Sequence, residues 1–154
     1  MKIGNEQVEQ LEEVLSELIW KTSSKSVFLV DINGELIAVA GYTGNINAVA
    51  LASLSASHFA ATVALARMLS EKQFTVLFHK GLSENIDINR VGNKLLLITI
   101  FGQKTVLGIL REETEKTIQK INDIVSQIPG VEEKPIKKVN NTLRDEINNL
   151  LKDM

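Results

Sequence analysis

The chain has 154 residues, a formal net charge of −2 and 44% hydrophobic residues, as in an ordinary single globular domain. Near-neutral charge gives no general attraction to nucleic acid or anionic lipid, and the absence of cysteine excludes disulfides and thiolate catalysis. The N-terminus is polar and acidic rather than signal-like, and no apolar run reaches the ~18 residues of a membrane span. We therefore expect a cytoplasmic protein without nucleic-acid or membrane partners.

The first forty residues predict a helix followed by a β-hairpin. Asn5 can cap the helix, and its apolar residues recur on one face: Val8, Leu11, Leu15, Leu18 and Ile19. Residues 26–32 and 35–40 are rich in Val, Leu and Ile and flank the dipeptide Asn33-Gly34. Asn-Gly between two apolar runs is a strong hairpin signal, because both residues tolerate positive φ.

After a loop at residues 41–44, residues 45–69 predict a long helix with two different faces. One face is bulky and mostly apolar, and we expect it to face the core: Leu51, Leu54, His58, Ala61, Leu65 and Met68. The other is a row of small residues closed by an arginine: Ser53, Ser57, Ala60, Ala64 and Arg67. No charged residue lies between Asn45 and Arg67, so this row predicts a flat partner-binding surface, although Ala and Ser are also ordinary helix residues.

The next segment predicts three strands and a helix. Residues 74–79 alternate like an edge strand, and residues 85–89 place Ile86 and Ile88 inward and Asp87 and Asn89 outward. Residues 94–101 are almost continuously apolar, as in a central strand. Helical spacing returns over residues 105–128, with apolar positions at Val106, Leu110, Ile118, Ile121, Val125 and Ile128.

The tail predicts a linker and a short amphipathic helix, after a domain that spans residues 1–128. Pro129-Gly130 stops the preceding helix, and residues 129–141 are highly charged. Residues 142–154 follow, with a capping pair at Thr142 and Asp145 and an apolar face of Leu143, Ile147, Leu150, Leu151 and Met154. A helix this short is marginal in water, so it either docks on this domain or a partner or is a frayed terminus.

Catalytic motifs are missing. The sequence has no G-x-x-x-x-G-K-[ST] loop, no G-x-G-x-x-G after a strand and no metal-ligand spacing of His or Cys. Ser57, His58 and Asp31 have the residue types of a nucleophilic triad, but neighbours on one helix point in different directions. We interpret His58 and His79 as structural and predict a non-enzyme with no cofactor and no metal.

Short segments spread along the chain resemble the Roadblock/dynein light chain family, and more narrowly its bacterial MglB group. They are Phe28-Leu29-Val30-Asp31, Asn33-Gly34, Leu36-Ile37, Gly41, Asn45-Ile46, Leu51-Ala52-Ser53-Leu54, Phe78-His79-Lys80-Gly81, Val91-Gly92-Asn93, Ile100-Phe101, Leu107-Gly108-Ile109-Leu110-Arg111 and Asp145-Glu146-Ile147-Asn148-Asn149-Leu150. The long helix departs from the pattern at Ala64 and Val63, where relatives tend toward Gly, and at His58, where they are often polar.

The resemblance implies an α/β/α sandwich with a five-stranded antiparallel sheet, in the order α-β-β-α-β-β-β-α plus the C-terminal helix. It implies a homodimer formed through the long helix and the third strand, with a Ras-like small GTPase of the MglA type docked across the paired helices. MglB-type proteins are expected to activate GTP hydrolysis without an arginine finger, by repositioning the GTPase's own residues in cell polarity and gliding motility.

Two alternatives remain open at this point. One is a scaffold or adaptor of Roadblock type in a motility or polarity complex, which binds partners without affecting hydrolysis. The other is a small-molecule sensor that uses the loop at residues 41–44 as part of a pocket, although the strands supply few inward polar residues to orient a ligand.

Overall fold

The computed structural model describes residues 3–71, 76–128 and 150–151. The secondary-structure elements follow the predicted order. They are α1 (Asn5–Thr22), β1 (Ser26–Asp31), β2 (Leu36–Gly41), α2 (Ala48–Met68), β3 (Val76–Lys80), β4 (Asn85–Val91), β5 (Leu95–Phe101) and α3 (Leu107–Ser126).

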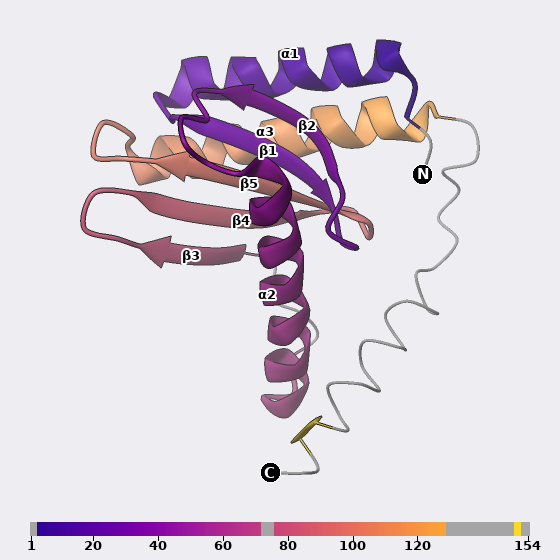
Figure 1. Ribbon diagram of the computed structural model, residues 1–154, viewed down its shortest axis with the longest axis vertical. Coiled ribbons are helices and arrows are strands. Elements are labelled where there is room, and N and C mark those ends of the chain that lie inside the picture. Colours follow the sequence, from indigo (N-terminus) through magenta and orange to yellow (C-terminus); the bar gives the residue numbers. More distant parts are fainter. Residues whose placement is uncertain (1–2, 72–75, 129–149, 152–154) are drawn as a thin grey trace.

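The five strands form one antiparallel sheet in the order β2-β1-β5-β4-β3. Helices α1 and α3 cover one face side by side, and α2 crosses the other face (Figure 1). Two apolar cores result, one on each side of the sheet, because neighbouring residues on β1 and β5 point in opposite directions. The predicted α/β/α sandwich and its five-stranded sheet are confirmed.

The predicted β1–β2 hairpin is confirmed, but the turn runs from Asp31 to Gly34, and of the pair Asn33-Gly34 only Gly34 has a positive φ. The backbone N–H of Asn33 donates to Asp31 Oδ1 at 2.7 Å, and that of Gly34 donates to the Asp31 carbonyl at 2.8 Å. Gly34 has φ +96°, and a Cβ there would lie 3.3 Å from the Cα of Ser53 in α2. The turn therefore needs glycine for its conformation and for its close approach to α2.

Helices α1 and α2 begin differently. The predicted cap at Asn5 is wrong, because the N-cap of α1 is Gly4 and no side chain caps this helix. In α2 the Asn47 side chain accepts from the backbone N–H of Ala50 at 3.1 Å, which satisfies one of the free N–H groups of the first turn.

Asp87 and Asn89 are buried beneath α3, which corrects the prediction that they face outward. Asp87 is 0% exposed, and its carboxylate accepts from the Asn89 amide at 2.8 Å. Alternation along β4 correctly separated these residues from Ile86 and Ile88. It could not show that both faces of the strand are covered, by α2 on one side and by α3 on the other.

The predicted linker at residues 129–141 and most of the predicted C-terminal helix lie outside the described residues. Of that segment the structure describes Leu150 and Leu151, which are helical, with Leu150 exposed.

Candidate partner-binding surface on α2

Helix α2 packs on the sheet mainly through small side chains, together with one large residue, Phe59. Its buried residues are Ala52, Ser55, Ala56, Phe59, Thr62 and Ala66. Ala52, Ala56 and Phe59 share a core with large residues of the sheet, among them Phe28 and Ile98. The bulk of this core thus comes from the strands, and the helix backbone lies close to them.

The bulky row of α2 faces solvent except at Leu51, which packs against the core, so the prediction is wrong for most of the row. Leu54 is 69% exposed, Leu65 52% and Met68 66%, and His58 and Ala61 are also exposed. Spacing shows which residues share a helix face, but it does not show which face meets the core. The large inward residues of the facing strands are the sequence signal that could have decided this, since a close-packed core leaves room for mostly small residues opposite them.

The small row lies beside the bulky row on the same outer surface. Ser53, Ser57 and Arg67 are exposed, and Ala60 and Ala64 are partly exposed. Ser57 Oγ donates to the Ser53 carbonyl at 3.0 Å, so this hydroxyl is turned back onto its own helix. The two rows together form an exposed helix surface with no charged residue before Arg67, which we call the α2 outer surface.

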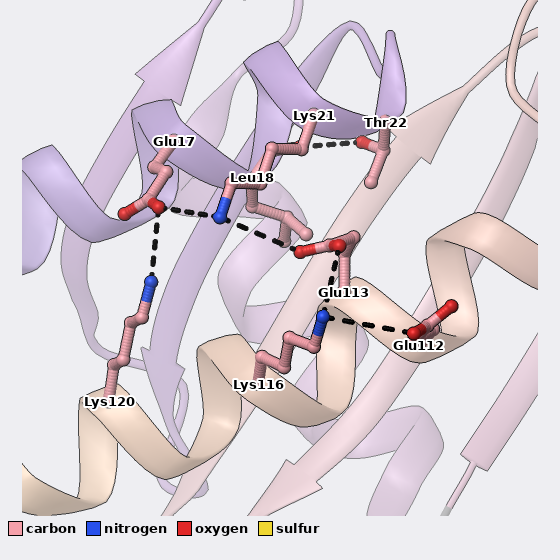
Figure 2. A network of polar contacts seen from close by, with 8 residues as sticks. All are labelled: Glu17, Leu18, Lys21, Thr22, Glu112, Glu113, Lys116 and Lys120. Atoms are coloured by element: carbon pink, nitrogen blue, oxygen red, sulfur yellow. Dashed lines mark hydrogen bonds and ion pairs between the residues drawn. The ribbon is translucent and has the colours of Figure 1, made fainter.

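The opposite layer of the molecule has a very different outer surface. There, Glu17 and Lys21 of α1 interact with Glu113, Lys116 and Lys120 of α3 in a network of charges that are exposed except for the partly buried Glu113 (Figure 2). Glu17 lies 2.7 Å from the Lys21 ammonium and 3.1 Å from that of Lys120. A solvated helix face normally looks like this one, so the uncharged α2 outer surface is the candidate site for a partner.

Helix α2 also meets the length and composition of a membrane span, with a mean hydropathy of 1.6 over an 18-residue window. Ser, Thr and His interrupt the segment, so it contains no unbroken apolar run of that length. Its contacts with β1 and β2 and its buried row are those of a helix packed on a sheet.

Strand β3 borders the α2 outer surface. It is the last strand of the sheet and pairs only with β4 among the described residues, so its other edge is open. His58 of the bulky row contacts His79 of β3, with ring centroids 4.7 Å apart. The bulky row therefore lies on the side of α2 that faces the open sheet edge, and the small row lies on the side away from it.

Arg90 and Arg67 differ in how their guanidinium groups are held. Arg90 lies within β4, where its Nε donates to the Gly92 carbonyl at 3.0 Å and its Nη2 to Asn93 Oδ1 at 3.2 Å. Burial lowers the pKa of the Arg90 guanidinium. Arg67 is exposed in the last turn of α2. Arg90 is thus fixed to the β4–β5 turn, whereas Arg67 projects from the candidate surface.

Within residues 3–71, 76–128 and 150–151, no group of three or more His, Cys, Asp or Glu side chains is arranged to hold a metal ion. The candidate triad residues do not form a catalytic arrangement either. Ser57 donates to its own helix, and Asp31 accepts the Asn33 N–H in the hairpin turn.

The Roadblock/LC7 domain model matches residues 10–101, and the chain belongs to this family. Its similar solved structures include MglB proteins. Myxococcus xanthus MglB is 35% identical, covering 77% of this chain and 97% of that one, with a TM-score of 0.74. The gliding protein MglB from Thermus thermophilus is 25% identical over 83% of this chain and 96% of its own, with a TM-score of 0.76. A structure described as MglB with a tetrameric arrangement is 27% identical, covers 80% of this chain and 93% of its own, and has a TM-score of 0.75. A search of curated proteins finds no match.

Proposed function

We propose that this MglB-like protein is a homodimeric activator of a Ras-like small GTPase of the MglA type, acting in the cytoplasm in cell polarity or gliding motility. The observation that carries the proposal is the α2 outer surface, a long uncharged helix face beside an open sheet edge. The family match and the MglB relatives support the class of partner that the sequence resemblance implies.

Dimerisation would use the bulky row of α2 and the open edge of β3. Leu54, Leu65 and Met68 expose apolar surface on the side of α2 that borders this edge. An exposed edge strand beside apolar side chains invites association, and symmetric pairing of two β3 strands would cover both features at once. The sheets of two protomers would then become continuous.

The small row would receive the GTPase. Ser53, Ser57, Ala60 and Ala64 let another backbone approach α2 closely, and Arg67 adds one positive charge at the end of the row. The C-terminal segment, for which the sequence predicts an amphipathic helix with Leu143, Ile147, Leu150 and Leu151, would add a second contact to this domain or to the partner.

The chemistry would remain within the GTPase. Arg90 is tied to Gly92 and Asn93 and would have to leave both to reach a phosphate. We therefore assign this protein the role of holding the partner's own residues in the arrangement that stabilises the transferring phosphoryl group.

A binding experiment tests the partner assignment. The MglA-type GTPase from the same genome is loaded with GDP or with a non-hydrolysable GTP analogue and titrated calorimetrically. We expect saturable binding of the GTP-analogue form with one GTPase per two chains, and at least tenfold weaker binding of the GDP form. Absence of binding in either nucleotide state would contradict the proposal. Tight binding without any stimulation of hydrolysis would favour the scaffold alternative instead.

A further inference from the structure

We propose that His58 and His79 form a binding site for a divalent transition-metal ion such as Zn²⁺, Ni²⁺ or Cu²⁺. The two side chains come from different layers of the fold, the helix α2 and the edge strand β3. Their ring centroids lie 4.7 Å apart with the ring planes tilted by 58°. His58 belongs to the bulky row and His79 to β3, so both lie in the surface proposed above for dimerisation, but metal binding by the pair does not require the dimer or the GTPase.

The spacing of the rings fits a shared metal ion. With a Zn–N distance of about 2.0–2.1 Å, the ion lies roughly 3.2 Å from the centre of each imidazole. Two imidazoles bound to one ion at angles of about 90–110° therefore have centroids roughly 4.5–5.2 Å apart. The observed 4.7 Å lies inside this range, so the separation of the two rings is compatible with a shared ion.

The chain places the two imidazoles on one side of the sheet. His79 pairs with Ile86 of β4, whose side chain packs in the core beneath α2. His79 therefore points to the α2 side, where His58 meets it. Lys80, the next residue, lies on the opposite side of the strand. The positive charge of Lys80 is thus directed away from the proposed metal site.

Both histidines are exposed, so an ion from solution can reach them. Neutral imidazole nitrogen is a favoured ligand of Zn²⁺, Cu²⁺ and Ni²⁺, whereas Mg²⁺ and Ca²⁺ prefer oxygen. Two protein ligands leave the other coordination positions to water or to a donor from a second molecule. Because His58 belongs to the bulky row, a second copy docked there could complete the site with its own pair.

Metal binding would connect α2 to β3. A ligand that binds only the folded protein raises its stability, and this pair exists only when the helix and the edge strand are in place. The alternative is that the rings merely pack against each other, as aromatic pairs do. The two interpretations differ in their response to metal, since packing alone requires none.

The experiment uses the full chain without a histidine tag, in a non-chelating buffer. ZnCl₂, NiCl₂ and CuCl₂ are titrated calorimetrically, and thermal unfolding is recorded with and without each metal. We expect saturable binding of one ion per chain, or one per two chains if a second copy completes the site. We also expect a rise of several degrees in the melting temperature that EDTA reverses, with no such rise for MgCl₂.

The variants His58→Ala and His79→Ala should each lose the saturable binding and the rise in melting temperature. Their metal-free melting temperatures and circular dichroism spectra show whether they still fold, and His58→Gln and His79→Gln provide a second pair if the alanine variants do not. No saturable binding by the wild-type protein would overturn the proposal. Binding that survives in either single variant would overturn it equally.

Discussion

Arg111 of α3 lies 3.8 Å from the fully buried carboxylate of Asp87 on β4, measured from Nη2 to Oδ1. Burial raises the pKa of the Asp87 carboxyl above its ordinary value of 3.8, and the Asn89 amide and Arg111 act against this increase. Asp87 Oδ1 and the hydroxyls of Thr99 and Thr114 have no hydrogen-bond partner among the described residues. The layer between β4 and α3 thus contains a charge that the fold only partly compensates.

Replacing this charge should change how stability depends on pH. Because the folded protein binds the Asp87 proton more readily than the unfolded chain, this residue favours folding increasingly as pH falls from neutral through its raised pKa. We expect Asp87→Asn to be at least as stable as the wild type at pH 7. Its stability relative to the wild type should then decrease toward pH 4. Urea unfolding of both proteins between pH 7 and pH 4 measures this difference in the free energy of unfolding. A large loss of stability in Asp87→Asn that is the same at every pH would show instead that the ionised carboxylate stabilises the fold.

The hairpin turn provides a test of local conformation. Gly34→Ala should lower the free energy of unfolding by about 1–2 kcal/mol, because alanine is strained at φ +96° and its Cβ meets Ser53. Gly108→Ala is the matched control, since a Cβ there meets nothing within 4 Å and α3 gains helix propensity. We expect this control to be neutral or to stabilise by up to about 1 kcal/mol. Equal losses of unfolding free energy in Gly34→Ala and Gly108→Ala would contradict this account of the turn.

The sequence predicted the fold well because its local signals agree with one another. Asn33-Gly34 fixes the hairpin, and the apolar run that ends at Phe101 identifies a central strand. These signals act over a few residues, so they can be read without knowledge of the tertiary structure. Apart from the cap at Asn5, the errors concern direction. The α2 outer surface and the burial of Asp87 both depend on what packs opposite, and the spacing along one element carries no information about that.

The same limit applies to the candidate site. The small row of α2 could be identified from its spacing, but the neighbouring bulky row was assigned to the core and its part in the surface was missed. The contact between His58 and His79 joins residues that lie far apart in the sequence. No local pattern contains this contact, so only the tertiary structure reveals it.

We predict that the protein is a dimer and that the bulky row is needed for it. Sedimentation at micromolar concentration should show twice the chain mass of 17.0 kDa. The double variant Leu54→Glu/Leu65→Glu should sediment as a monomer with its fold intact, because both side chains are exposed in the single chain. A wild-type protein that sediments only as a monomer would contradict this prediction, and so would a double variant that still dimerises.

The small row should be needed for the GTPase rather than for the fold. Ala60→Arg/Ala64→Arg adds two long cationic side chains one turn apart where close approach is required, and we expect at least a tenfold loss of GTPase affinity with helix content unchanged. Gln119→Arg/Asn122→Arg adds the same charge to exposed positions of α3 and should bind normally. Unfolding of the small-row variant would show that our assignment of faces is wrong, and so would normal GTPase binding.

The central claim is that this protein accelerates hydrolysis by a partner GTPase without contributing an essential side chain. The most direct test is the single-turnover rate of GTP hydrolysis by the MglA-type GTPase at saturating wild-type protein, Arg67→Ala and Arg90→Ala. We expect clear stimulation by the wild type, and nearly the same saturated rate with each variant even where more protein is needed to reach it. An arginine finger contributes about 10³–10⁵ in rate, so a collapse of the saturated rate in either variant would identify that arginine as one and contradict the account. Absence of stimulation by the wild-type protein would contradict it as well.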